Sequence, residues 1–308
     1  MAKMINPPDL NEADNLLKTL LNDVQRAEGT LAGGEARRIG KAEAAVSSLF
    51  KTEVRFGTPK DKLRRLTEEI FQESGAELTP MFKRQMQEQY DFYYMAVPVI
   101  MKPEPGVQFV QLACELDFGP KGSDEPIIQT IFPTDKWRDV MNFGVGMNVG
   151  LDGSLSWNIG VDSTNLPEVL KRFSGDLQAK IANKDEFKAF IAIPEYKYQL
   201  GRSEITALGE SSPTCYWYIQ DPELQKMTSM EFATVFKVPK GTESITLKGI
   251  AWAEPNMNWL TMNVEHVFRR LTDNLKNLLT HDGKAIPDLS RGVEETWTLT
   301  LPKPITAS

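Results

Sequence analysis

The chain has 308 residues, of which 41% are hydrophobic and 25% are charged, and its formal net charge is −7 at pH 7. This composition is typical of a globular protein and excludes a disordered one. The negative charge argues against a protein that binds duplex nucleic acid, because neutralising phosphates requires a basic surface.

Residues 1–90 are predicted to form a helical region. Apolar residues recur at helical spacing after the N-cap residue Asn11, and again in residues 35–50. These two segments are therefore expected to form an antiparallel helical hairpin, with Leu17 and Leu21 on the apolar stripe of the first helix.

Two further helices are predicted before the first long strand. Thr58-Pro59 and Thr79-Pro80 each place a hydroxyl N-cap before a proline at the first helical position. The first of these helices is expected to cover residues 60–74, and the second to reach Tyr93. Four helices in this region would make a bundle or an arm.

After Tyr93 the hydrophobic pattern changes from the helical period to the period of 2 that is typical of strands. Strands are predicted at residues 95–101, 107–118, 127–132, 187–193, 196–208, 215–220, 232–238, 244–253 and 294–301. Amphipathic helices are predicted at residues 166–182 and 263–279.

The most regular alternation lies in residues 143–161, where apolar residues alternate with glycine and small polar residues on both sides of Asp152-Gly153. An Asp-Gly pair between alternating arms predicts a β-hairpin. The pattern fits a hairpin that inserts into a membrane and also a hairpin packed on one face of a soluble protein. Its arms of 8 and 7 residues are shorter than the roughly 9–11 residues of a membrane strand.

The predicted fold is α+β. The helical region (1–90) precedes a β-rich half with the glycine-rich hairpin and a helix (91–185), and a second β-rich half with a helix and a C-terminal strand (186–308). The same order of strand, acidic turn, proline, glycine and amphipathic helix recurs about 105 residues apart. Internal duplication is one interpretation, and two unrelated strand-and-helix segments are the other.

No catalytic motif is recognisable, and no cofactor or metal site is expected. Cys114, Cys215, His266 and His281 lack zinc-ligand spacing, and structural roles are expected for all four. Aspartates are scattered among predicted turns, and the cations Lys60, Lys62, Arg64 and Arg65 lie close together, as a solvated face or as a surface for an acidic partner.

Three functions remain open. The first is a non-catalytic, cytoplasmic assembly or adaptor protein that binds copies of itself or a protein partner. The second is a pore-forming or membrane-remodelling protein that inserts residues 143–161, and the third is a hydrolase whose carboxylates converge only in the folded chain. The residues chosen as a candidate interaction or insertion surface are Gly144, Gly146, Gly150, Trp157, Leu17 and Leu21.

Overall fold

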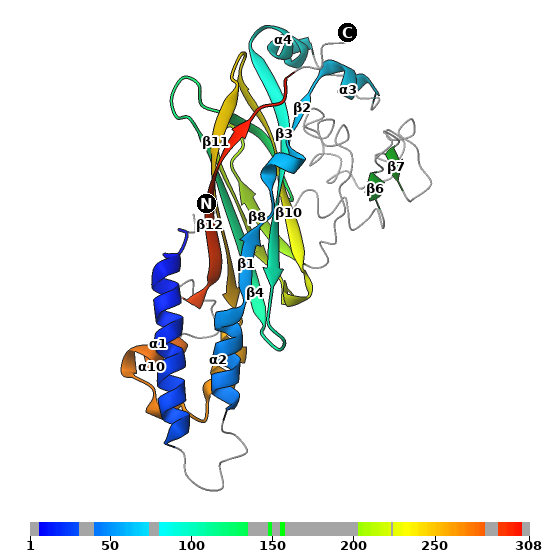
Figure 1. Cartoon of the computed structure of the whole chain (residues 1–308). Coiled ribbons are helices and arrows are strands. Elements are labelled where there is room, and N and C mark those ends of the chain that lie inside the picture. The colour runs from blue at the N-terminus through cyan, green and yellow to red at the C-terminus, as the bar shows by residue number, and fades with distance from the viewer. Residues whose placement is uncertain are drawn as a thin grey trace.

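The computed structural model describes residues 6–30, 40–73, 80–134, 147–149, 155–157, 203–222, 224–280 and 289–303. Within these ranges the chain forms two five-stranded antiparallel sheets, a two-stranded sheet and six α-helices. The two larger sheets face each other as a sandwich, and α1, α2 and α10 gather at one end of it (Figure 1). The predicted α+β class is confirmed.

Sheet A contains two short strands at one edge and three longer ones. Its strands are β1 (Glu53–Phe56), β2 (Arg64–Leu66), β3 (Tyr90–Lys102), β5 (Ile127–Phe132) and β10 (Ser229–Pro239). The order is β1–β3–β10–β5, and β2 pairs with a different stretch of β3 than β1 does. β10 pairs with almost the whole of β3, so residues far apart in the sequence form the centre of this sheet.

Sheet B has the order β12–β11–β4–β9–β8. Its strands are β4 (Phe109–Gly119), β8 (Glu204–Leu208), β9 (Thr214–Gln220), β11 (Ser244–Pro255) and β12 (Arg291–Thr300). In β9 the residues Cys215, Trp217 and Ile219 are buried and the alternate residues are partly or fully exposed. The period of 2 in the sequence therefore decides which residues enter the core between the sheets.

The helices α1 (Leu10–Gly29) and α2 (Lys41–Lys51) lie side by side and extend the core beyond the end of the sandwich (Figure 1). The N-cap of α1 is Asp9 and not the predicted Asn11, because Asp9 accepts hydrogen bonds from the backbone N–H groups of Asn11 and Glu12. Leu17 is fully buried, like Leu20 and Val24, and all three belong to the main core cluster. The predicted helix pair is confirmed, and it is docked on its own chain.

A buried carboxylate joins the two helices. Gly40 precedes α2 and has no side chain to cap it, whereas Glu28 Oε1 of α1 accepts a hydrogen bond of 3.1 Å from the Ala42 N–H in the first turn of α2. The same oxygen lies 3.1 Å from His266 Nε2. Glu28 therefore replaces the missing N-cap of α2 and connects the helix pair to the segment that follows α9 (Met257–Val264).

Replacing Glu28 by alanine is expected to lower the free energy of unfolding by about 2 kcal/mol, because α2 loses its cap and His266 loses a buried partner. The measurement is urea unfolding followed by circular dichroism. Glu43→Ala is the matched control, since Glu43 is a partly exposed carboxylate on α2 that accepts a hydrogen bond from Gln25; it is expected to cost less than about 0.5 kcal/mol. Equal losses for the two variants would contradict the capping role.

The predicted helix over residues 60–74 is wrong. This segment forms a 3₁₀ turn, η1 (Pro59–Lys62), then β2, then the short α3 (Glu68–Glu73). Leu63 enters the main core and Leu66 enters a second core on the outer face of sheet A. A helix would place residues three apart on one face, whereas pairing with the free edge of β3 separates them.

Two other predicted helices have different limits. α4 (Pro80–Glu88) ends before Tyr90, because β3 begins there and pairs with β10. The helix predicted at residues 263–279 is divided into α9, the 3₁₀ turn η4 (Phe268–Arg270) and α10 (Asp273–Leu279). The break occurs at Leu271, whose backbone is extended, and Arg270 beside it binds the Ala27 carbonyl at the end of α1.

Both predicted β-rich halves contribute strands to sheet A and to sheet B. The duplication stays a prediction. The helix at residues 166–182, the strand at 187–193 and the start of the strand at 196–208 lie outside the described residues; β8 is the end of the last of these.

Candidate functional site

The predicted hairpin is confirmed in its central part. β6 (Met147–Val149) and β7 (Leu155–Trp157) pair antiparallel on either side of the Asp-Gly turn sequence. The register places Met147 opposite Trp157, Asn148 opposite Ser156 and Val149 opposite Leu155. Opposed residues in an antiparallel pair share a face, so four apolar positions fall on one face of this ribbon and two polar positions fall on the other.

The β6–β7 ribbon is a sheet of its own. It pairs with neither sheet A nor sheet B among the described strands, and Figure 1 shows it beside the sandwich. It lies in the long connection between β5 and β8. A two-stranded ribbon alone is at best marginally stable in water, so its apolar face requires a further surface to cover it.

The other candidate residues are not gathered at this ribbon. Gly144, Gly146 and Gly150 lie outside the described residues. Leu17 is fully buried in the core, and Leu21 is partly buried and packs against the same cluster. Of the six chosen residues, only Trp157 is described as part of the ribbon.

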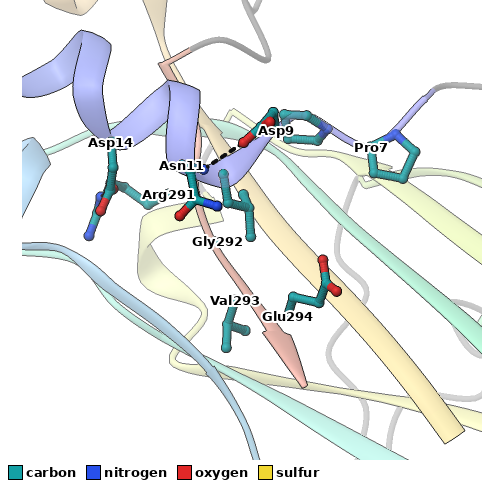
Figure 2. A pocket seen from close by; sticks show the side chains of 10 residues that line it. Pro7, Asp9, Asn11, Asp14, Arg291, Gly292, Val293 and Glu294 are labelled. Carbon is teal, nitrogen blue, oxygen red and sulfur yellow. Dashed lines mark hydrogen bonds and ion pairs between the residues drawn. The ribbon is translucent and has the colours of Figure 1, made fainter. Parts of the chain in front are cut away.

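A polar groove of about 700 Å³ lies where the start of α1 crosses β12 (Figure 2). Arg291 lines it together with Asp14, with which it forms an ion pair. The same guanidinium donates to the Thr52 carbonyl at 3.1 Å and lies 5.3 Å from the centre of the Phe50 ring. Through these contacts Arg291 joins α1, α2 and β12. The charged residues of this groove therefore have a structural role.

Both cysteines are buried and free, on the adjacent strands β4 and β9. Burial raises the pKa of the Cys114 thiol and of the Cys215 thiol well above the ordinary value. A buried neutral thiol is a poor nucleophile, which agrees with the structural role expected from the sequence.

Two aspartates, one in β4 and one directly after β9, have local partners. Asp117 accepts hydrogen bonds from Lys121 Nζ and from Thr214 Oγ1, and Asp221 accepts one from Ser203. Across the described ranges, no group of three or more His, Cys, Asp or Glu side chains is placed to hold a metal ion. His281, Asp152 and Asp162 lie outside those ranges.

The basic cluster found in the sequence lies along the β1 edge of the sandwich. Lys60 and Lys62 belong to η1, and Arg64 and Arg65 belong to β2. Arg65 pairs with Asp91 at 2.6 Å and Lys62 pairs with Glu231 at 3.3 Å. Lys60 and Arg64 are exposed. The cations are evident in the sequence, but their position on a sheet edge is not, because the sequence predicts a helix there.

Comparison with protein-family models and with curated protein sequences finds no match. Among the solved structures, a pore-forming protein has a TM-score of 0.30 and 8% identity, over 67% of this chain and 79% of that one. The delta-toxin of Clostridium perfringens has a TM-score of 0.31 and 7% identity, over 67% of this chain and 78% of the toxin. The membrane-inserted NetB toxin of the same organism has a TM-score of 0.27 and 7% identity, over 67% of this chain and 83% of the toxin. Similarities this weak establish neither a family nor a function.

None of the helices that the structure describes is long and apolar enough to cross a bilayer.

Proposed function

We propose that this chain is a membrane-inserting, pore-forming protein, and that residues 143–161 are the segment that enters the bilayer. The observation that supports it is the register of the β6–β7 ribbon, which gives one apolar and one polar face to a sheet that is separate from the sandwich. An inserted ribbon of this kind turns its apolar face to lipid and its polar face to water.

The length of the ribbon is compatible with insertion if flanking residues join it. The first arm ends at Gly150, and Met141 keeps the alternation two residues before Phe143. Extension to Met141 brings this arm to the roughly 9–11 residues that a tilted membrane strand requires. In the second arm the next positions of the same face are Ser163 and Asn165, so its extension beyond Val161 would place polar residues at the membrane surface.

A single inserted ribbon would leave backbone N–H and C=O groups unpaired along both of its edges. Unpaired backbone groups cost several kcal/mol each in hydrocarbon. Ribbons from several copies must therefore pair edge to edge inside the membrane. Pore formation thus includes the self-association that the sequence suggested, with the ribbon rather than the helix pair as the inserted element.

Two adjacent cysteine substitutions test the proposal. Asn148→Cys and Val149→Cys are labelled with an environment-sensitive fluorophore on the native protein, where Cys114 and Cys215 are buried and remain unlabelled. Vesicles of phosphatidylcholine, alone or mixed with phosphatidylglycerol, are added with an encapsulated dye. We expect dye release, with a strong increase in emission from the probe at residue 149 and a water-like spectrum from the probe at residue 148.

The alternation between the two probes is the decisive readout. Adsorption of the ribbon without insertion would change both probes in a similar way. No dye release from either vesicle type, with both probes unchanged, would overturn the proposed function.

A further inference from the structure

The sandwich has two lateral sides that differ in charge. On one side the edge strands β1 and β12 meet, and the rings of Phe56 and Trp297 are 5.1 Å apart. On the other side the turn after β8 closes on β5, where Ser211 N–H donates to the Ile128 carbonyl at 2.8 Å. The two sides lie at opposite ends of both strand orders.

On the side that carries β1, the segment that contains β1 and β2 is basic. Residues 51–66 contain six cations and two carboxylates. Arg55, Lys60 and Arg64 are exposed and form no ion pair with any other residue that the structure describes. We call residues 51–66 the basic edge.

On the other side, the segment that contains β8 is acidic. Residues 203–212 contain Glu204 and Glu210, both exposed, and no cation. Asp124, in the segment that precedes β5, is also exposed. In the same segment, Lys121 forms ion pairs with Asp117 and Glu125. Leu208, at the end of β8, leaves 45% of its surface exposed. We call residues 203–212 the acidic edge.

We infer that the partner of each edge is a second copy of this chain, docked head to tail with its basic edge on the acidic edge of its neighbour. Different surfaces on the two sides make a heterologous contact, which generates rings when the rotation closes. An isologous dimer formed through like edges would instead place charges of one sign together. The inference rests on the proposed function for its purpose, since inserted ribbons need neighbours, but its geometry comes from the sandwich.

The charges are expected to set orientation and rate more than total affinity. Each exposed ion pair contributes only about 0.2–1 kcal/mol, whereas complementary charge speeds and orients the encounter of two surfaces. Leu208, exposed at the end of β8, would supply an apolar contact within the acidic edge. Assembly should therefore weaken as salt rises, because screening acts over about 8 Å at physiological ionic strength.

Charge reversal on each edge tests the inference. One variant carries Arg55→Glu, Lys60→Glu and Arg64→Glu, which leaves three cations and five carboxylates in residues 51–66, and the other carries Glu204→Lys and Glu210→Lys. Each alone has two edges of the same sign, so the fraction of chain recovered as oligomer from phosphatidylcholine vesicles should fall at least tenfold. An equimolar mixture restores complementary contacts at every junction and should recover the wild-type yield. Arg84→Glu, on the exposed face of α4, is the control.

Light scattering on detergent-extracted complexes gives the oligomer yield, and thermal melting verifies that each variant is folded. Oligomers from either variant alone, a mixture that fails to recover, or a wild-type chain that stays monomeric would overturn the inference. Dye release that is unaffected by both reversals would support the proposed pore and contradict this interface. Oligomers that follow the expected pattern without any dye release would support this interface and contradict the proposed pore.

Discussion

Val149→Arg is expected to reduce dye release from phosphatidylcholine vesicles by at least two orders of magnitude, whereas Asn148→Arg is expected to retain release. The two residues are adjacent in β6 and therefore occupy opposite faces of the ribbon. An arginine on the lipid face of an inserted strand costs about 2–4 kcal/mol near the bilayer midplane. Every copy in an assembly carries the substitution, so the cost is repeated at each subunit.

The polar face gives the matched control a measurable effect of its own. Arginine in place of Asn148 would face the water-filled interior, where it adds positive charge without contact with lipid. We expect the ion selectivity of single channels in planar bilayers to shift toward anions in this variant. Equal loss of dye release in both variants would contradict the assignment of the two faces. Equal retention of dye release would contradict the insertion of the ribbon into the bilayer.

Much of the sandwich can be predicted from the sequence because alternation is local. Residues 127–132 are predicted as a strand with the limits that β5 has in the structure. The strand predicted at 244–253 is the greater part of β11. In the first part of both strands every second residue is buried, which requires no knowledge of the partner strand, whereas the last residues are buried on both faces.

The two short strands of the basic edge could not be predicted in this way. Thr58-Pro59 is a valid local signal for the start of a helix, and η1 does begin there. The segment leaves helical geometry at Leu63 because β3, thirty residues later in the chain, offers a free edge to β2. A local propensity is worth a few tenths of a kcal/mol per residue, so tertiary pairing overrides it.

The candidate site shows the same division. The hairpin follows from Asp152-Gly153 and its alternating arms, since turn and strands are neighbours in sequence. The acidic edge has no sequence signal, because β8, which begins at Glu204, and β5, which follows Asp124 in the chain, lie on the same side of the sandwich only through the strand order. Leu17 and Leu21 illustrate a third case: both lie on the apolar stripe, and only the docked position of α1 shows that Leu17 is the deeper residue.

Leu17→Ala is expected to lower the free energy of unfolding by about 2–5 kcal/mol, the usual cost of removing a fully buried leucine side chain. The side chain has no exposed surface and packs in the core that α1 shares with the sandwich. Leu21→Ala is the matched control on the same helix, and its partly buried side chain should cost about half as much or less. Chemical denaturation followed by tryptophan fluorescence measures both.

This pair of variants separates a structural helix from an exchangeable arm. If α1 served to bind a partner, Leu17→Ala would weaken assembly while the isolated chain kept its stability. A docked α1 predicts the reverse order, with unfolding at lower denaturant and assembly reduced only where the chain itself is unfolded. Deleting residues 1–30 should then yield an unstable sandwich rather than a folded monomer, since Leu20 and Val24 also leave the core. The proposed assembly is therefore better probed at exposed edge residues than by truncation.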